Sequence, residues 1–349
     1  MDPTLHVFHW DPKFFQSFQS FLMNRYGVER NPVLLEGAPP DIKLPEGVLR
    51  LNERSRFTKV RHYWSSLEAT PRTILHGAFD ADLRVALAAR PDLAARCWWV
   101  PWGGDLYWAA GRAKTVKSWL HRAMFKTAVR RFPHLLTYMP ADAELARNAL
   151  GFRGTRLPCL MYDSNVVSDQ ISNMPLRAHA ETVQPLRVFV GNSATPSSHH
   201  YDAFHTLEPL RDRDVRVYCA LNYGDPLYRD SVIARGRELF GAKFKPLTAW
   251  MPRARFEELL GTMDVGVFAH HRQQGMGTTI GLLGLGKRVV LRTGTSQAKY
   301  FAGIGVQFTT LDTPNFSPMS ATEADQNRRL MLEHHGRATY ERYWDAVLC

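Results

Sequence analysis

Residues 264–279 read DVGVFAHHRQQGMGTT, and this stretch decides the fold class more than any other part of the chain. The apolar run 265–268 predicts a buried strand, the small residues of 278–285 predict a helix, and residues 288–291 predict a second strand. Together they form one βαβ unit of a parallel sheet. The first turn of such a helix has backbone N–H groups without intrahelical partners and the positive end of the helix dipole. The loop is therefore a candidate phosphate-binding site.

The side chains of this loop suit an anionic ligand that also has polar groups. The arginine offers a planar fork of donors for a diphosphate, and each of the two glutamines can both donate and accept hydrogen bonds. A structural alternative stands beside this interpretation: the glycines would only turn the chain, and the glutamines would only enter the helix. The candidate ligand-binding residues here are Arg272, Gln273, Gln274, Gly275, Gly277 and Thr278.

Length and charge limit the class of protein. The 349 residues allow two domains that each bury a core, and 45% hydrophobic with 22% charged residues is typical of a globular protein. The net charge of +11 favours an anionic partner, such as a phosphorylated ligand, an acidic membrane surface or nucleic acid. The four cysteines are far apart and form no Cys-x-x-Cys pair, which indicates reduced thiols rather than a disulfide or zinc framework. No secretory signal and no apolar stretch of membrane-spanning length is seen, so we expect a cytoplasmic protein.

Alternation of short apolar runs with helical patterns predicts two parallel-sheet domains of the α/β class. We expect an N-terminal domain over 1–162, a linker over 163–185, a second domain over 186–322, and a C-terminal helical segment, 323–349, that packs back on the first domain. In the first domain the predicted strands are 5–9, 33–36, 73–76, 97–100, 135–138 and 156–160, and the helices include 13–23, 81–90, 112–131 and 141–150.

Three successive strands of the second domain are followed by small or polar residues. Strand 186–190 precedes Gly191, Asn192 and Ser193, and strand 215–220 leads to Asn222 and Tyr223. The third is the strand that precedes the arginine and glycine loop. Since loops at the carboxyl ends of parallel strands converge on one crevice, we expect these residues to line a single ligand site.

Four segments together carry a resemblance to a known family. They are HGAFDADL (76–83), WGGDLYW (102–108), VGNS (190–193) and RQQGMG (272–277), which resemble the bacterial TDP-N-acetylfucosamine:lipid II N-acetylfucosaminyltransferases of enterobacterial common antigen synthesis. The likeness runs in order from about residue 5 to residue 295, while residues 37–70 and the linker match poorly. It implies a GT-B architecture of two facing Rossmann-like domains, with the nucleotide sugar on the second domain and the acceptor on the first.

Sugar transfer needs stabilisation of the leaving diphosphate and, when the configuration inverts, a base for the acceptor hydroxyl. The resemblance implies that the ligand site of the second domain binds the sugar donor, and we expect it to stabilise the diphosphate without a metal ion or other cofactor. The two glutamines of the loop would hydrogen bond to hydroxyl or acetamido groups of the sugar. Two Asp-x-Asp spellings, at 80–82 and 212–214, are better explained as a helix cap and a turn. For the base we favour Asp105, at a strand end that would face the interdomain cleft, with His76 second. The structural alternative is a capping aspartate and a core histidine.

The segment 112–131 is rich in basic residues and contains Trp119. We interpret Trp119, Arg122, Lys126 and Arg130 as a contact surface for anionic lipid head groups and the polyprenyl diphosphate, with a solvated helix face as the alternative. The expected partners are thus a TDP-sugar donor, a polyprenyl-diphosphate-linked acceptor and the cytoplasmic face of the bacterial inner membrane.

Other functions remain as alternatives. The nearest is transfer of another TDP- or UDP-sugar to a different surface glycan, and a nucleotide-sugar epimerase is more distant. A dehydrogenase lacks its fingerprint, because Trp10, Asp11 and Pro12 follow the first strand instead of Gly-x-Gly-x-x-Gly. The basic charge also permits a nucleic-acid-binding protein, although no reader motif occurs, and we expect no nucleic-acid partner.

Overall fold

A computed structural model describes residues 2–53, 55–176 and 185–349 of the chain. It divides into two compact units, one formed by residues 1–163 together with 340–349, and the other by residues 164–339. Each unit is built on its own sheet, in which every pair of neighbouring strands is parallel. The two parallel-sheet α/β domains predicted from the sequence are confirmed.

The first unit contains a seven-stranded sheet in the order β3-β2-β1-β4-β5-β6-β7. Strand order reverses between β1 and β4, so the loops after these two strands separate and leave room for a ligand. The strands are β1 (Thr4–His9), β2 (Val33–Glu36), β3 (Val48–Leu51), β4 (Arg72–His76), β5 (Cys97–Val100), β6 (His134–Leu136) and β7 (Thr155–Leu157).

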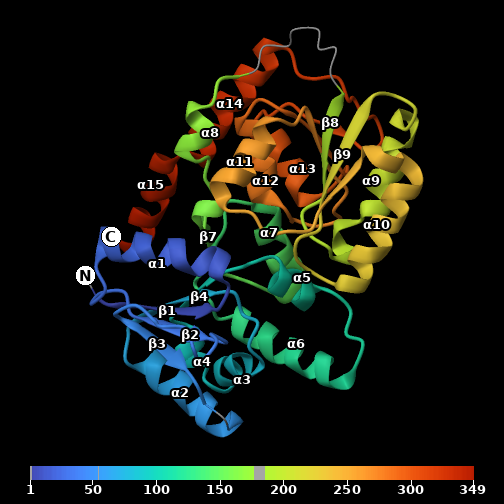
Figure 1. Ribbon diagram of the computed structural model, residues 1–349. Helices are drawn as coiled ribbons and strands as arrows, with labels where there is room; N and C mark the ends of the chain where they lie inside the picture. Colours follow the sequence, from blue (N-terminus) through green and yellow to red (C-terminus); the bar gives the residue numbers. More distant parts are fainter. Residues whose placement is uncertain (1, 54, 177–184) are drawn as a thin grey trace. The chain divides into compact units, whose positions relative to one another are not determined.

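Helices cover both faces of this sheet (Figure 1), with α1 and α15 on one face and α2, α3 and α6 on the other. Buried aromatic side chains, among them Tyr63, Trp99 and Phe125, fill the core under the second group. The helices are α1 (Pro12–Tyr26), α2 (Arg56–Glu68), α3 (Ala81–Ala89), α4 (Pro91–Ala94), α5 (Gly104–Ala110), α6 (Val116–Val129), α7 (Pro140–Leu145), which continues as a π-helical turn over Ala146–Leu150, and α15 (Arg337–Leu348).

Helix α15 is attached to α1 by packing of aromatic side chains and by an ion pair. Tyr340 packs on Phe21 with ring centroids 4.6 Å apart, and Trp344 packs on Phe18 at 4.9 Å. The guanidinium of Arg25 donates to both carboxylate oxygens of Asp345 at 2.8 and 2.7 Å. Residues 340–349 therefore complete the core of the first unit.

The second unit contains a six-stranded sheet in the order β10-β9-β8-β11-β12-β13, which reverses between β8 and β11. In Figure 1, α9 and α10 lie on one side of its strands and α11, α12 and α13 on the other. The strands are β8 (Leu186–Val190), β9 (Val215–Ala220), β10 (Phe244–Leu247), β11 (Val265–Phe268), β12 (Arg288–Leu291) and β13 (Thr309–Thr310), and the helices are α8 (Asp169–Asn173), α9 (His200–Leu207), α10 (Pro226–Phe240), α11 (Arg253–Gly261), α12 (Met276–Gly284), α13 (Ser296–Gly303) and α14 (Ala321–His335).

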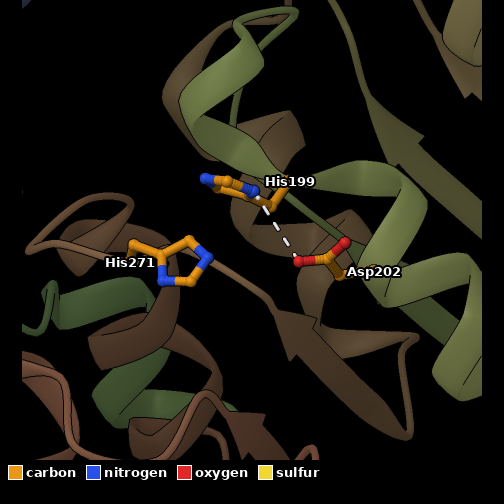
Figure 2. Close-up of side chains that lie close together, drawn as sticks. All are labelled: His199, Asp202 and His271. Atoms are coloured by element: carbon orange, nitrogen blue, oxygen red, sulfur yellow. Dashed lines mark ion pairs between the residues drawn. The ribbon is translucent and has the colours of Figure 1, made fainter.

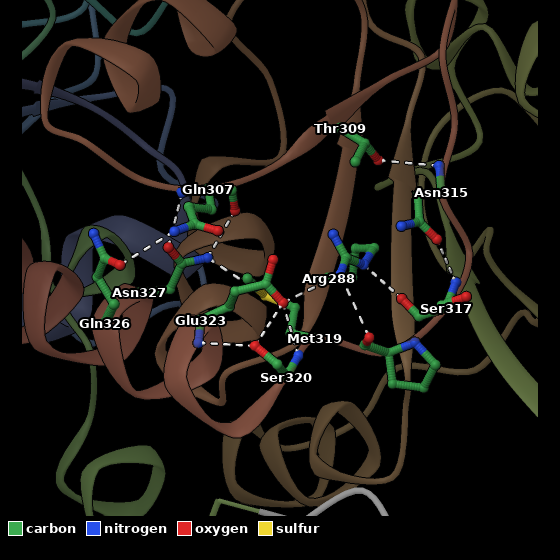
Figure 3. A network of polar contacts seen from close by, with 11 residues as sticks. Arg288, Gln307, Thr309, Asn315, Ser317, Met319, Ser320, Glu323, Gln326 and Asn327 are labelled. Carbon is green, nitrogen blue, oxygen red and sulfur yellow. Dashed lines mark hydrogen bonds and ion pairs between the residues drawn. The ribbon is translucent and has the colours of Figure 1, made fainter.

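The C-terminal segment, predicted as one helical region, is two helices that belong to different units. A capping box at Ser320 and Glu323 begins α14, and Arg288 of β12 pairs with Glu323 at 3.6 Å. Asn327 donates to the Gln307 carbonyl at 2.7 Å and accepts from its N–H at 2.8 Å (Figure 3). This network fixes α14 to the second unit, so only the residues after Thr339 join the first.

Part of the predicted linker, 163–185, belongs to the second unit. Residues 164–176 belong to the second unit, where Ile171 of α8 is buried and Gly281 and Gly284 of α12 leave room for it. Arg328 of α14 donates to the Met174 carbonyl at 2.7 Å. These contacts were not predicted from the sequence, because the segment has few apolar residues. Several of the contacts are made by backbone carbonyls, which the sequence pattern does not report. Residues 177–184 lie outside the described residues.

Two further expectations differ from the structure. The predicted helix 112–131 begins only at Val116, because Gly111 ends α5 and the Thr115 side chain caps α6 by accepting from Ser118 N at 3.1 Å. Residues 37–70, for which no element was predicted, contain β3 and α2. None of the helices in the described part of the chain is both long and apolar enough to cross a membrane.

Candidate functional site

The loops after β8, β9 and β11 meet at the carboxyl edge of the second sheet. The Ala194 N–H donates to the Tyr223 carbonyl at 2.7 Å, and the Asn192 amide donates to the Tyr223 hydroxyl at 2.8 Å. Ser197 donates to the Gln274 side-chain oxygen at 2.8 Å and accepts from Arg272 at 3.5 Å. The sequence expectation that these loops converge is therefore met by direct contacts.

The predicted donor residues differ in how much of each side chain is already used. Gln274 also donates to Thr195 and Ser198 at 3.3 Å each, so it holds the loop in place. Ser193 is buried and contacts the same hydroxyl cluster, with Thr195 at 3.0 Å. The side chains that are half-buried or exposed at this edge, and thus accessible to a ligand, are Asn192, Asn222, Tyr223, Arg272, Gln273 and Thr278.

Glycine is required at two of the predicted positions by close approach. Gly191 has φ of +73°, and a Cβ there would stand 2.5 Å from Nε2 of His200. A Cβ on Gly277 would stand 2.4 Å from the carbonyl oxygen of Ser164. Gly275 has φ of +67° and no side chain that could cap α12. The first turn of α12 thus keeps backbone N–H groups available at a partly exposed surface.

A buried histidine lies beside this helix start. His270 is 1% exposed, and its Cε1 atom would be 3.2 Å from a Cβ on Gly275. Neither ring nitrogen has a hydrogen-bond partner among the described residues. Burial lowers the pKa of His270 to about 3, and the neighbouring His200 and Arg272 add to the shift. A neutral ring with unmet hydrogen bonds at the N-terminus of a helix is suited to receive a polar ligand atom.

Three side chains of the second unit could hold a divalent cation. They are His199, Asp202 and His271, whose ligand atoms all lie within 4.8 Å of one another (Figure 2). His199 Nδ1 is 3.7 Å from Asp202 Oδ2, and two imidazoles with a carboxylate suit zinc or a similar ion. The Asp202 carboxylate also accepts from Arg292, which competes with a cation for the same oxygens. No sequence motif predicted this group of three side chains, because His271 lies far from His199 and Asp202 in the chain.

In the first unit, His76 is part of a buried chain of hydrogen bonds. Its Nδ1 is 2.9 Å from the Tyr162 hydroxyl, and its Nε2 is 2.9 Å from Nδ1 of His6. Trp102 donates to Tyr162 at 2.6 Å, and His6 reaches the Asn31 side-chain oxygen at 3.4 Å. One direction of donation, from Trp102 through Tyr162, His76 and His6 to Asn31, satisfies every member with both imidazoles neutral.

The environment of His76 argues against its predicted role as the base. It is fully buried, and burial together with the neighbouring His6 holds its pKa well below the ordinary value. The sequence placed it correctly at a strand end, but the ring points into the layer under α1, where Phe8 stacks on it with centroids 4.6 Å apart. We therefore interpret His76 as a structural histidine.

Asp105, the favoured base, is also occupied. Its carboxylate accepts from the N–H groups of Ala78 at 3.0 Å and of Trp102 and Leu106 at 2.9 Å each, and from the Trp99 indole at 2.9 Å. It is 1% exposed, and burial raises its pKa although these four donors oppose the shift. Asp105 thus ties the loop after β4 to the loop after β5, and its oxygens are not accessible to an acceptor.

Comparisons with known proteins identify the family and the fold of this chain. Residues 50–307 match the model of the 4-alpha-L-fucosyltransferases, glycosyl transferase group 56, which covers well over half of the chain. The chain belongs to this fucosyltransferase family. The resemblance noted from the four sequence segments is confirmed, and the chain is a glycosyltransferase.

Solved structures show that this fucosyltransferase-family chain has the GT-B fold. Trehalose 6-phosphate synthase from Burkholderia multivorans has a TM-score of 0.65 at 10% identity, covering 99% of this chain and 98% of that chain. Sucrose-phosphate synthase from Thermosynechococcus elongatus has a TM-score of 0.67 at 10% identity, with the same coverage. Anabaena HepE in complex with UDP-glucose has a TM-score of 0.65 at 11% identity and 99% coverage of both chains.

On α6 of the fucosyltransferase-family chain, the predicted contact residues divide into two groups. Trp119 is 62% exposed, and Arg130 is exposed as well. Arg122 is directed back onto its own unit, where its guanidinium lies 5.2 Å from the Trp108 ring and donates to the Gly111 carbonyl. Lys126 is half-buried. Trp119 and Arg130 therefore remain available for a surface contact, and Arg122 stabilises the turn between α5 and α6.

Sequence reasoning missed one pair in the first unit. His9 is the last residue of β1 and Glu36 is the last residue of β2, and they are register partners in the sheet. His9 Nδ1 lies 3.1 Å from the Glu36 Oε1 atom. The available signal was that both residues end predicted neighbouring strands, but the lateral pairing appears only in the structure.

Proposed function

We propose that this glycosyltransferase moves a deoxy-amino sugar, of the 4-acetamido-4,6-dideoxygalactose type, from a TDP-sugar to a polyprenyl-diphosphate-linked saccharide in bacterial surface polysaccharide synthesis. The observation that carries the proposal is the uncapped start of α12 with the buried, unsatisfied ring of His270 beside it. Family membership and the GT-B fold supply the reaction class. HepE was solved with UDP-glucose, which supports a nucleotide-sugar donor here.

The proposed donor site stabilises the diphosphate as negative charge develops on it. The N–H groups at the start of α12 and the guanidinium of Arg272 donate to its oxygens, and His270 donates one ring N–H. Asn192, Asn222 and Tyr223 line the nucleotide, and Gln273 contacts the sugar. Gln274 and Ser193 act by holding these loops in position, because their polar atoms are already engaged. These donors neutralise the leaving group without a metal ion.

Thermal unfolding with added nucleotides tests the donor assignment. Ligand at a hundred times its dissociation constant adds about 2.7 kcal/mol to the free energy of unfolding. We expect TDP to stabilise the protein more than UDP, and NAD or an oligonucleotide to have no effect. The same shift is expected with EDTA present. Stronger stabilisation by UDP than by TDP would favour a UDP-sugar as the donor, and stabilisation by an oligonucleotide would favour the nucleic-acid alternative. Loss of the TDP-induced shift in EDTA would indicate a metal ion, for which His199, Asp202 and His271 are the candidate ligands.

We further propose that the N-terminal part of α6 contacts the anionic, cytoplasmic face of the inner membrane, where the lipid-linked acceptor is found. Val116 is 83%, Trp119 62% and Leu120 45% exposed, so three large apolar side chains are open to solvent. The exposed basic residues Arg112 and Lys117 lie near them in the sequence, and residues 106–141 contain no acidic residue. An apolar patch within basic residues fits an anionic bilayer surface.

Replacement of Val116 and Trp119 by glutamate should release the protein from vesicles. Two apolar contacts are lost and two charges are added that anionic lipid repels, so we expect at least a tenfold fall in binding to vesicles with phosphatidylglycerol. Cosedimentation measures the bound fraction. Trp250→Glu, at a tryptophan that is 75% exposed on the second unit, is the matched control and should bind like the wild type. Equal binding of the α6 variant and the control would contradict the membrane contact.

A further inference from the structure

His9 and Glu36 form a pair at the point of the first sheet where ligands of parallel α/β folds bind. Strand order reverses between β1 and β4, and His9 ends β1 beside this reversal. The His9 side chain is 37% exposed, whereas the Glu36 side chain is 2% exposed. A histidine at the surface is thus hydrogen bonded to a carboxylate beneath it.

The buried carboxylate has a second partner that fixes its position. The hydroxyl of Tyr63, a fully buried residue of α2, donates to Oε2 of Glu36 while Oε1 faces His9. With Nδ1–H of His9 donating to Glu36, the lone pair of the neutral ring is on Nε2. Tyr63 and Glu36 therefore select the tautomer in which Nε2 can accept a proton.

The surroundings of His9 suit an organic acceptor. The ring of Phe79, after β4, has its centroid 5.1 Å from the His9 ring, and the ring of Trp102, after β5, is at 6.2 Å. Phe14 of α1 packs on Trp102 at 5.0 Å. All three are half-buried, so aromatic surface is accessible next to the imidazole.

We propose that His9 is the general base of the transfer reaction and that Glu36 is its positioning residue. Nε2 takes the proton of the acceptor hydroxyl as that oxygen forms a bond to the anomeric carbon. The bond between this carbon and the diphosphate breaks, and TDP leaves with the electron pair. Glu36 stabilises the imidazolium that forms. This assignment rests on the proposed function, and it replaces Asp105 and His76, whose polar atoms are all engaged within the fold.

The charges that face His9 give the pH dependence its sign. The hydrogen bond that His9 donates to Glu36 is the largest cause that raises the pKa of His9. The negative charges of Asp80 and Asp11 also raise this pKa by smaller amounts, and partial burial opposes the shift. Lys59 of α2 is paired with Asp80. Protonated His9 cannot accept a proton, so turnover should fall as pH decreases through this raised pKa. Glu36→Gln removes the main cause of the shift and should move the acid limb to lower pH.

Turnover against pH, measured with labelled TDP-4-acetamido-4,6-dideoxygalactose and bacterial lipid extract, tests the pair. His9→Gln should lower kcat by about 10²–10⁴-fold and remove the acid limb, and Glu36→Gln should lower kcat less and shift the limb. His62→Gln is the matched control, because His62 is 31% exposed and lies 3.1 Å from Glu53 in the same unit. It should behave like the wild type.

TDP-induced thermal stabilisation, recorded for the same proteins, separates this proposal from the proposed function. If TDP stabilises His9→Gln as much as it stabilises the wild type while turnover is lost, the result supports His9 as the base and Glu36 as its positioning residue. Retained turnover with an unchanged acid limb in His9→Gln overturns the pair and leaves the donor assignment standing. No effect of TDP on the wild type overturns the donor assignment itself. If Glu36→Gln does not fold, the absence of an acid limb in the wild type would be decisive against His9.

Discussion

Replacement of Arg272 by alanine should weaken TDP binding by about ten- to a hundredfold. A hydrogen bond from a charged donor contributes about 1.5–3 kcal/mol when its partner is an anion, and the guanidinium can make two. The contact of Arg272 with Ser197 is a long one at 3.5 Å, so loss of this contact should contribute little to any change in fold stability. Isothermal titration with TDP measures the loss of affinity, and thermal unfolding without ligand checks the fold.

Arg255→Ala is the control for this variant. Arg255 is on α11 of the same unit, its side chain is 75% exposed, and it pairs with Glu258 at 3.1 Å. We expect its TDP affinity to equal that of the wild type. If Arg272→Ala also bound TDP with wild-type affinity, the diphosphate would have to be held elsewhere.

Replacement of Asp142 by asparagine should stabilise the protein at pH 8. Asp142 is 2% exposed in α7, and its Oδ1 atom has no hydrogen-bond partner within the described chain. Burial, with Asp105 nearby, raises the pKa of Asp142 to about 7. The folded protein therefore holds a proton that the unfolded chain releases at lower pH.

The sign of the pH dependence follows from the raised pKa. The contribution of Asp142 to stability is fully present below the unfolded pKa of about 4, and it is lost as pH rises through the folded value of about 7. About three pKa units correspond to about 4 kcal/mol. Asparagine cannot ionise, so Asp142→Asn should lack this loss. Urea unfolding at pH 4 and pH 8 measures it, and an equal pH dependence in both proteins would show that the carboxyl is not buried in this way.

Much of the fold could be predicted because the strands of a parallel sheet correspond to short apolar runs in the sequence. The strands that end at His76 and at Val190 were placed correctly, since each contains a short run of buried apolar residues. The edge strand β3 was missed because Leu49 is 61% exposed and the strand lacks such a run. The helix predicted over 112–131 was too long because Thr115, which caps the start of α6, was included in one basic pattern.

The candidate site could be predicted only where neighbours in sequence form it. The loop that contains Arg272 and Gly275 is local, so spacing alone was enough to predict it as a candidate site. The role of a residue such as His76 depends on Tyr162, 86 positions later, and no periodicity reports that contact. The pair of His9 and Glu36 depends on which strands lie side by side. Sequence therefore indicated which residues stand at strand ends, but not which of their polar atoms were already satisfied.

The division of the C-terminal helices between the units has a consequence for biosynthesis. Tyr340 and Trp344 fill the core over Phe18 and Phe21, yet the ribosome makes them only after the whole second unit. Until then α1 lacks the aromatic surface that covers it. The N-terminal part of the nascent chain therefore keeps apolar side chains exposed to solvent until synthesis ends, whereas the second unit can complete its fold earlier. Chaperones would then bind mainly to the part of the polypeptide that leaves the ribosome first.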